Sequence, residues 1–362
     1  MFAPTTASLK DKELIIRADA DPRIGIGHVM RCLALADEWI GRGGKAVLVG
    51  KIEGDPIKER IKSFAVDMVE LEASYPESSI DLTTLLEQTA TAPEGSWIVL
   101  DGYFLDHEYQ RRVMESFQNL LVIDDYCHHE KYFAAAILNP DPGAELFDYP
   151  VDRKTALLTG PEYALLRKEF RSTGQDKNRT VTGVRKVLIT MGGADAENVS
   201  LTALKALDKI EEKLDITVVA GPANPHKNSL DDFGKQSKQM INLLSNVQNM
   251  AELITAQDLV ISAGGSTCLE VCALARPLVI AVTAENQSAF SNELANYGAA
   301  INTAELNDES EERIFEAVNN LIGDDNLRQA LIDKASRIVD GLGTARIVDF
   351  LNSPVPSPKD NI

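Results

Sequence analysis

A histidine that directly follows two glycines is the residue of this sequence best suited to acid–base chemistry. In the stretch IRADADPRIGIGHVMRCLALA (residues 16–36), Gly25 and Gly27 precede His28 where a strand gives way to a helix. Glycines allow a tight turn with close backbone approach, and an imidazole has a reference pKa of about 6.5. His28 could therefore close a turn, hold a metal or act as a general base, and we expect Gly27 and His28 to face the ligand.

The same glycines invite a dinucleotide-binding interpretation, which the spacing disfavours. In the G-x-G-x-x-G fingerprint, the third glycine allows close packing of the helix on the strand. Met30 occupies that place here. We therefore expect neither a nicotinamide nor any other bound cofactor.

Two glycine turns in the second half have the composition of phosphate-binding loops. MGGADAEN carries Gly192 and Gly193 after an expected strand, and ISAGGSTCLE carries residues 264–267 in the same position. Backbone N–H groups at such strand-to-helix turns can hold a phosphate. Tight turns without any ligand would have the same composition, so this alternative stays open.

Acidic and aromatic residues also follow the expected strands of the first half, namely Asp19, Asp21, Asp101, Tyr103, Asp124 and Asp125. Acidic pairs can hold a divalent cation, and His128 and His129 beside Cys127 could be ligands. A helix start that binds phosphate makes a cation unnecessary, and no second Cys/His pair lies near these histidines. We therefore expect no metal.

Short β-rich runs alternate with helical patterns along both halves, which is typical of parallel βαβ units. Strands are expected at residues 14–19, 46–50, 67–72, 97–102, 120–125, 135–139, 186–191, 216–221, 240–245, 258–263 and 277–282. The expected fold class is α/β, with two Rossmann-like doubly wound domains facing a cleft. Ligands bind at the carboxyl ends of the strands in such sheets, where the residues above lie.

The domain boundaries follow from the polar stretch EFRSTGQDKNRTVTGVR, which lacks periodicity. We expect a first domain over residues 1–168, a linker over 169–185 and a second domain over 186–362, with the last helix able to pack back on the first domain.

Charge and composition exclude several classes of partner. With 362 residues, 44% hydrophobic residues and a net charge of −19, the chain has the balance of a soluble globular protein that repels nucleic acid and anionic membranes. The beginning of the chain lacks the apolar core of a secretion signal, and the four cysteines show no paired spacing. We expect a cytoplasmic protein with free thiols and a small-molecule substrate.

Several motifs occur in a characteristic order along the chain: R-x-D…G-x-G-H-x-x-R-x-x-x-L-A (residues 17–36), DGY, IDD, GPEYALLR, MGGADAEN, ISAGGSTCLE and ENQ. This set resembles the bacterial UDP-2,4-diacetamido-2,4,6-trideoxy-β-L-altropyranose hydrolases of pseudaminic acid biosynthesis. The chain departs from that family where DGY replaces the more usual DHY, and in the loop DPRIGIGH. The resemblance implies the GT-B architecture and metal-independent hydrolysis of a UDP-sugar.

The resemblance also implies roles for individual residues. The backbone near Gly265, Ser266 and Thr267 would hold the pyrophosphate, together with the turn at Gly192 and Gly193. Further UDP contacts would come from Val247, Met250 and Glu270, and sugar contacts from Arg17, Asp19, Gly27, Tyr103, Asn286 and Gln287. Two alternatives remain structural: Glu270 could complete a capping box with Ser266 or Thr267, and the ENQ residues could belong to a surface loop.

The chemistry expected from this set is an inverting hydrolysis. UDP is a good leaving group, so the enzyme needs a stabilised diphosphate and an activated water. His28 would be the general base for water that attacks the anomeric carbon from the opposite face. The alternatives are a UDP-sugar glycosyltransferase of GT-B type and a non-catalytic nucleotide-sugar binding protein, which a buried and fully hydrogen-bonded His28 would favour.

Overall fold

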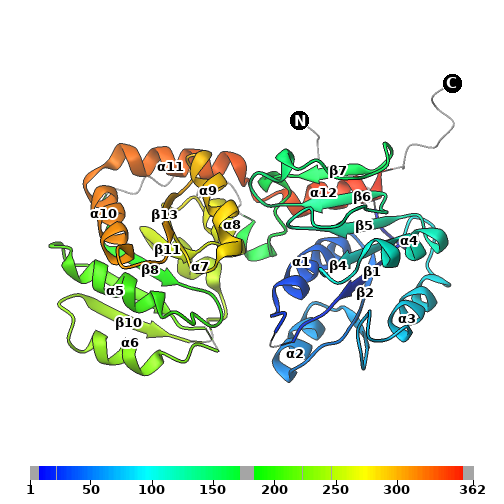
Figure 1. Cartoon of the computed structure of the whole chain (residues 1–362), viewed down its shortest axis with the longest axis horizontal. Helices are drawn as coiled ribbons and strands as arrows, with labels where there is room; N and C mark the ends of the chain where they lie inside the picture. The colour runs from blue at the N-terminus through cyan, green and yellow to red at the C-terminus, as the bar shows by residue number, and fades with distance from the viewer. Residues whose placement is uncertain (1–7, 22, 172–182, 222, 246, 354–362) are drawn as a thin grey trace. The chain divides into compact units, whose positions relative to one another are not determined.

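The chain folds into two α/β units, each built on one parallel sheet (Figure 1). The structure is a computed structural model that describes residues 8–21, 23–171, 183–221, 223–245 and 247–353. The first unit comprises Met1–Lys168 and Leu342–Ile362, and the second comprises Glu169–Gly341.

Within the described residues, the first unit holds a seven-stranded parallel sheet in the order β3-β2-β1-β4-β5-β6-β7. Its strands are β1 (Glu13–Ala18), β2 (Lys45–Gly50), β3 (Asp67–Glu70), β4 (Trp97–Asp101), β5 (Leu120–Ile123), β6 (Ala136–Asn139) and β7 (Ala156–Thr159). Its helices are α1 (Gly27–Gly41), α2 (Asp55–Ser63), α3 (Ile80–Thr89), α4 (His107–Ser116) and α12 (Gly343–Asn352), with short 3₁₀ turns at Ala144–Leu146 and Pro161–Tyr163.

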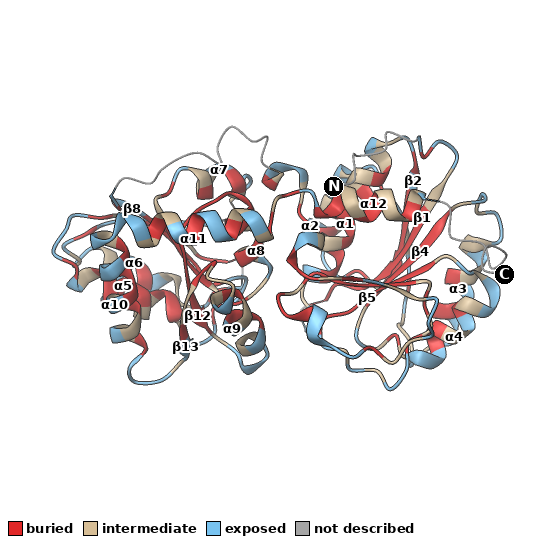
Figure 2. Cartoon of the chain, turned by 90° about the horizontal axis from the view of Figure 1, so that it is seen from above, coloured by how far each residue is buried: buried red, intermediate tan, exposed pale blue. Residues whose placement is uncertain are grey.

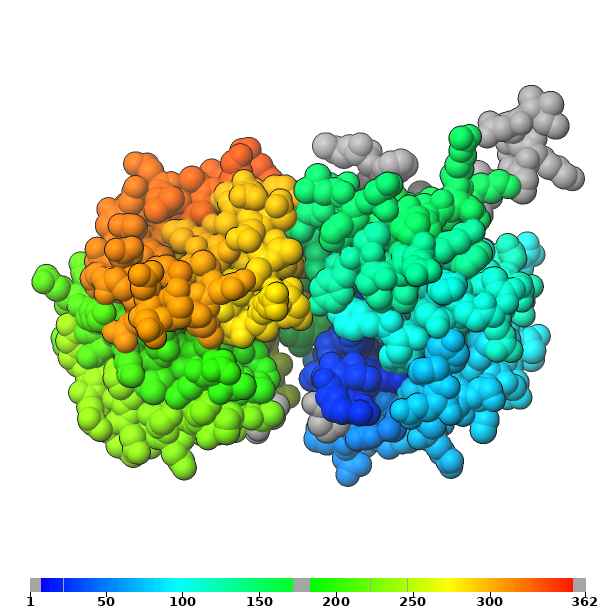
Figure 3. All heavy atoms as spheres, viewed as in Figure 1, coloured from blue at the N-terminus to red at the C-terminus, as the bar shows by residue number. Residues whose placement is uncertain are grey.

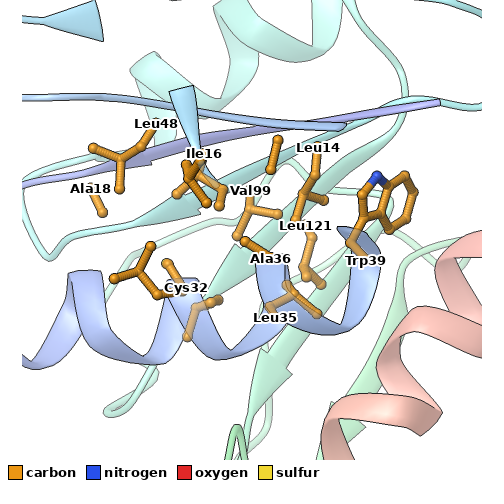
Figure 4. Close-up of a cluster of buried hydrophobic side chains, with 14 of the residues drawn as sticks. Leu14, Ile16, Ala18, Cys32, Leu35, Ala36, Trp39, Leu48, Val99 and Leu121 are labelled. Atoms are coloured by element: carbon orange, nitrogen blue, oxygen red, sulfur yellow. The ribbon is translucent and has the colours of Figure 1, made fainter. Parts of the chain in front are cut away.

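Both faces of this sheet are covered, because alternate residues of each strand enter different cores. On one face, Leu14 and Ile16 of β1 pack with Leu35 and Trp39 of α1 (Figure 4). On the other face, Ile15 joins a second core with residues of α3 and α4. Burial on both faces explains why β1 is apolar along most of its length. Side chains that could take part in chemistry are therefore expected at the strand ends.

The second unit repeats this plan. Its described residues hold a six-stranded parallel sheet in the order β10-β9-β8-β11-β12-β13. The strands are β8 (Lys186–Thr190), β9 (Asp215–Val219), β10 (Met240–Leu244), β11 (Leu259–Ala263), β12 (Leu278–Val282) and β13 (Ile301–Glu305). The helices are α5 (Val199–Lys209), α6 (Lys227–Gly234), α7 (Met250–Thr255), α8 (Ser266–Ala273), α9 (Ser288–Asn296), α10 (Ser310–Gly323) and α11 (Asp325–Ile338), with a 3₁₀ turn at Glu285–Gln287. Another 3₁₀ turn, at Lys168–Phe170, begins at the last residue of the first unit's first segment. Figure 2 shows that most strands in both sheets are buried.

The last helix, α12, packs in the first unit although its sequence follows the second. Ile347, Val348 and Leu351 enter the same core as α1, and Trp97 Nε1 donates a hydrogen bond of 2.7 Å to the Leu351 carbonyl. The sequence had left open that the last helix packs back on the first domain. Of the expected linker, residues 172–182 lie outside the described residues.

Each strand expected from the sequence is present, with ends that differ by no more than two residues. The prediction of two doubly wound α/β sheets is therefore confirmed. The sequence prediction lacks β7 and β13, which lie at the sheet edges and are partly exposed. Such strands need no continuous apolar run, so their sequences carry little signal.

None of the described helices combines the length and the apolar character needed to cross a membrane.

Candidate active site

The turn before α1 is held in place by its own acidic residue. Asp21 Oδ1 accepts hydrogen bonds of 2.7 Å from the N–H groups of Arg23 and Ile24, and Gly25 adopts a φ of 80°. A left-handed residue of this kind favours glycine. The turn is largely exposed, and the dark-blue segment in Figure 3 that contains it reaches the surface of the first unit. The chain then enters α1 at Gly27, which places His28 in the first turn of the helix.

His28 forms a dyad with an aspartate from the neighbouring strand. Its Nδ1 lies 2.6 Å from Asp101 Oδ1, at the last residue of β4, and β1 pairs directly with β4. The His28 side chain is 10% exposed, and the Tyr103 ring packs edge-on against it with centroids 4.9 Å apart. Among the described residues, no hydrogen-bond partner is found for Nε2. The ring is thus buried but not fully hydrogen-bonded.

Arg31, one turn along α1, clamps two carboxylates at once. Its Nε and Nη2 donate to the two oxygens of Asp101 at 2.6 Å each, and its Nη1 donates to Asp125 Oδ1 at 2.6 Å. The Tyr103 hydroxyl donates to the other Asp125 oxygen at 2.6 Å. His28 and Tyr103 therefore belong to one hydrogen-bonded network that runs through Asp101, Arg31 and Asp125.

The charges of this network fix the state of Asp101. Burial alone would raise the pKa of Asp101, but the charges and hydrogen bonds of Arg31 and His28 hold it well below its usual range. An ionised Asp101 can only accept, so His28 Nδ1 carries the proton of the neutral ring. The lone pair of the neutral imidazole then lies on Nε2, which is the arrangement of a general base oriented by a carboxylate.

A fourth carboxylate lies near this network. Asp141, just beyond the end of β6, is half-buried, and burial raises its pKa to about 7, with Asp125 and Asp124 adding to the shift and Arg31 opposing it. Asp124 itself is committed to structure, because it accepts hydrogen bonds from the hydroxyls of Tyr132 and Tyr149. In the described part of the chain, no three His, Cys, Asp or Glu side chains are grouped to hold a metal.

Arg17 and Asp19, predicted to contact the sugar, lie in the framework instead. Arg17 is fully buried, and its guanidinium donates to Asp19 and to Asp81, with contacts of 2.5 Å and 2.6 Å. Asp19 also accepts from the Lys51 N–H and the Ser74 hydroxyl. An arginine with no exposed surface cannot touch a ligand in this structure. The pair instead fixes the end of β1 ahead of the His28 turn.

The second unit offers an uncapped helix start at α8. Gly265 is the N-cap, its conformation is extended, and no side chain caps the helix. Ser266 is exposed and Thr267 half-exposed in the first turn. Both residues lie inside the helix, so neither is its N-cap. The capping-box alternative for Glu270, which is half-buried on the same helix, loses its basis for the same reason.

The turn at Gly192 and Gly193 differs from that at α8. Both glycines are exposed, but the first N–H groups of α5 are already taken by Asp195, which accepts from Val199 N at 2.7 Å and from Ser200 N at 3.2 Å. A phosphate at this helix start would compete with a carboxylate. The expectation of a helix-dipole phosphate site here is therefore not supported, and only the glycine loop itself remains accessible.

The other predicted residues of the second unit also follow strands. Val247 and Met250 are half-buried after β10, and Asn286 is exposed in the turn after β12. Gln287 has a structural contact: its Oε1 accepts from the N–H of Gly264 at 3.2 Å and from the N–H of Thr283 at 3.0 Å. Gln287 thus ties the end of β12 to the turn before α8.

Sequence reasoning assigned no role to Asp101, Asp125 or Asp141, nor to Arg31 beyond its place in a motif. Asp101 lies 73 residues from His28, and no local spacing links them. The one available signal was topological, because the first and fourth strands of a doubly wound sheet with the classic 3-2-1-4 order are neighbours. The aspartate that ends the fourth strand was thus a candidate partner for the residue after the first.

Comparison with known proteins places these features in context. Residues 186–341 match the model of the Glycosyltransferase family 28 C-terminal domain. MurG of Acinetobacter baumannii superposes with a TM-score of 0.69 at 15% identity, over 94% of this chain and 99% of that chain. Alr3699/HepE of Anabaena, solved in complex with UDP, superposes with a TM-score of 0.62 at 12% identity, over 93% and 98%.

Three curated relatives share 23–25% identity. An uncharacterized protein of Methanocaldococcus jannaschii aligns over 74% of this chain but 55% of its own length, and the spore coat polysaccharide biosynthesis protein SpsG of Bacillus subtilis over 56% and 59%. The UDP-2,4-diacetamido-2,4,6-trideoxy-β-L-altropyranose hydrolase of Campylobacter jejuni aligns over 79% of this chain and 97% of its own length. The chain thus spans little more than half of the first two relatives. The chain has the GT-B fold, and its residues 186–341 are similar to the glycosyltransferase family 28 C-terminal domain.

Proposed function

We propose that this protein hydrolyses a UDP-linked 2,4-diacetamido-2,4,6-trideoxy hexose at its anomeric C–O bond and releases UDP and the free sugar with inversion. The reaction would belong to nonulosonic (pseudaminic) acid biosynthesis. Support for the substrate comes from the motifs shared with the hydrolase family and from a relative aligned over 97% of its own length.

The observation that carries the reaction type is the His28–Asp101 dyad. Its 2.6 Å contact places the proton of the neutral ring on Nδ1 and the lone pair on Nε2. Nε2 takes a proton from water as the water oxygen bonds to the anomeric carbon. The C–O bond to the nucleotide breaks on the opposite face, and its electron pair leaves with UDP. General bases of this kind contribute on the order of 10²–10⁴ in rate.

The departing diphosphate is assigned to the start of α8. No side chain caps this helix and no acidic residue lies in its first turn, so its N–H groups remain suited to an anion. The exposed glycine loop at Gly192 and Gly193 would add backbone contacts. Because N–H groups carry the charge stabilisation, the proposed reaction uses no metal and no cofactor.

The remaining contacts to the substrate rest on the resemblance. Glu270 would accept hydrogen bonds from the ribose hydroxyls, and Val247 and Met250 would lie near the uracil. Tyr103 and Asn286, both exposed, would contact the sugar or the attacking water, together with Gly27 and Gln287. Arg17 and Asp19 would act on the sugar site only through the backbone they hold.

A UDP-sugar glycosyltransferase is the second candidate. It is favoured by the family 28 domain at residues 186–341, and the same dyad could deprotonate a hydroxyl acceptor in place of water. The two candidates differ in whether UDP is released when no acceptor is present.

The deciding experiment incubates the purified protein with a panel of UDP-sugars in ¹⁸O-labelled water without acceptor. We expect release of UDP from the diacetamido-trideoxy substrate, label at the anomeric oxygen of the sugar, and an inverted first anomer by NMR. His28→Asn should lose most turnover and keep UDP binding, whereas His107→Asn, at an exposed histidine of the same unit, should match the parent. Turnover that appears only with an added sugar or lipid acceptor would favour the transferase, and label in UDP would exclude this mechanism.

A further inference from the structure

The guanidinium of Arg31 lies between the dyad and a second carboxylate. It makes two hydrogen bonds of 2.6 Å to Asp101, and its bonds to Asp125 measure 2.6 Å and 3.2 Å. Its Nη2 also lies 3.2 Å from His28 Nδ1. The side chain is 20% exposed, so these contacts are only weakly screened by water.

The position of this cation matters for the charge of the imidazole. A carboxylate alone beside a histidine favours the imidazolium form, which cannot accept a proton. The positive charge of Arg31 offsets part of the attraction that Asp101 exerts on an imidazolium. Arg31 also repels an imidazolium directly, because both groups are cations at close range. Both effects favour the neutral ring that a general base requires.

Asp125 acts in the opposite sense. Its negative charge engages the far side of the guanidinium, and it accepts the hydrogen bond of the Tyr103 hydroxyl at 2.6 Å. Burial and the Asp125 charge raise the pKa of Tyr103, so its hydroxyl keeps its proton and remains a donor to Asp125. The negative charge of Asp125 offsets part of the positive charge of Arg31, so the guanidinium acts less strongly on the His28–Asp101 dyad.

We infer that Arg31 is a positioning residue that holds Asp101 and keeps His28 in its neutral form, and that its charge, shared with Asp125, sets the pH at which the site becomes active. This inference rests on the proposed function in assigning His28 the role of base. The geometry carries it, since one guanidinium bonds both carboxylates and lies beside the imidazole.

The groups that face this network from the surrounding elements must be accounted for in any pH experiment. They are Asp101 on β4, Cys32 on α1, Tyr103 after β4, Asp125, Tyr126 and His128 after β5, and Asp141 after β6. Of these, Asp141 has its pKa raised to about 7, mainly by burial, so its own titration would be superimposed on the pH profile. The variants below are therefore measured both in the native background and with Asp141→Asn.

The test follows the protonation of His28 by NMR in the full-length protein, with His28→Asn used to assign its signal, and records kcat against pH in parallel. In Arg31→Met we expect the midpoint of His28 protonation, and with it the acid limb of kcat, to move up by about one pH unit or more. Arg31→Lys keeps the charge and should shift much less. Asp125→Asn should move the midpoint in the opposite direction. Arg111→Met, at an exposed arginine of α4, serves as the control.

The outcomes separate this inference from the proposed function. If Arg31→Met loses activity while the NMR midpoint of His28 protonation does not move, Arg31 is merely structural. The same conclusion would follow if Arg31→Lys and Arg31→Met shifted the midpoint equally. If Arg31→Met does not fold, Asp125→Asn still tests the inference, because it should lower the midpoint of His28 protonation. An unchanged midpoint in Asp125→Asn would overturn the inference. Should the midpoints move as expected while no UDP-sugar is hydrolysed, the charge role of Arg31 would stand and the proposed function would fail.

Discussion

At the scale of single residues, the site is organised by the competition of a few carboxylates for one cation. Asp101 is kept ionised because Arg31 and His28 both bind it, whereas among the described residues the Arg31 guanidinium donates hydrogen bonds to Asp101 and Asp125 but not to Asp141. The pKa values of the two carboxylates therefore shift in opposite directions. A carboxylate that is hydrogen-bonded to a cation keeps its charge in the interior, and one that is not takes up a proton more readily.

Asp141 makes this contrast measurable as a dependence of stability on pH. Its pKa is raised from 3.8 to about 7 in the folded chain, so between these values the folded state holds a proton that the unfolded state has released. Stability should therefore fall as pH rises through this window. Asp141→Asn removes that loss, and its gain in Tm over the parent should be small near pH 4 and grow up to about pH 7 or 8.

Thermal unfolding followed at a series of pH values would check this expectation. Asp152→Asn provides the control, because Asp152 is exposed in the same unit and lies 4.0 Å from Lys131 as its ion-pair partner. A Tm difference for Asp141→Asn that stays constant from pH 4 to pH 8 would contradict the assignment.

At the scale of elements, two helices of the second unit, α5 and α8, differ in how the N–H groups at their starts are satisfied. The N–H groups at the start of α5 are satisfied by Asp195, and those at the start of α8 have no side-chain cap. Internal carboxylates stabilise a helix start by the same contacts that an external phosphate would use. A helix start left without one suits a ligand, so of the two glycine turns predicted to bind phosphate, the contrast favours the one before α8.

Gly265→Asp tests the contrast by giving α8 the cap that α5 has. Gly265 has an extended conformation with φ −152°, and a Cβ added there would meet no atom within 4 Å, so an aspartate fits. We expect a gain in stability of only a few tenths of a kcal/mol from the new cap, because glycine is itself an acceptable N-cap residue. We expect UDP affinity to drop about tenfold or more, because the new carboxylate occupies the N–H groups and repels the diphosphate.

Calorimetric titration with UDP and thermal unfolding would measure the two effects. Gly265→Asn separates charge from size, since it can cap the helix without adding a negative charge and should weaken UDP less. If Gly265→Asp binds UDP as tightly as the parent, the diphosphate lies elsewhere.

The elements also show which features a sequence can predict and which it cannot. Strands buried on both faces, such as β1 and β4, have apolar runs that mark them clearly, whereas the exposed edges at β7 and β13 do not. His28 was indicated by its glycines, but its partner Asp101 depends on strand order. The burial of Arg17 depends on Asp81, which is 64 residues away and belongs to no motif. Long-range contacts of this kind leave no local pattern.

At the scale of the whole molecule, the chain crosses from the first unit to the second and then returns with α12. This return places α12 in the core that α1 also enters, and the Trp97 indole donates a hydrogen bond to the Leu351 carbonyl. The first unit is therefore incomplete until the second has been synthesised, while the second is contiguous in sequence. The two units should respond differently to the loss of the last residues.

A chain that ends at Gly341 should lose the stability of the first unit and keep that of the second. Ile347, Val348 and Leu351 are at most 2% exposed, and burying three such side chains is worth about 5–9 kcal/mol as an upper estimate. That is comparable with the whole stability of a typical domain, about 5–15 kcal/mol. We expect calorimetry to show the loss of one unfolding transition, and limited proteolysis to digest residues 8–168 before residues 183–341. Leu351→Ala, which removes part of one side chain, should lower the same transition without abolishing it, and equal loss of both transitions in the truncated chain would show that the second unit also depends on α12.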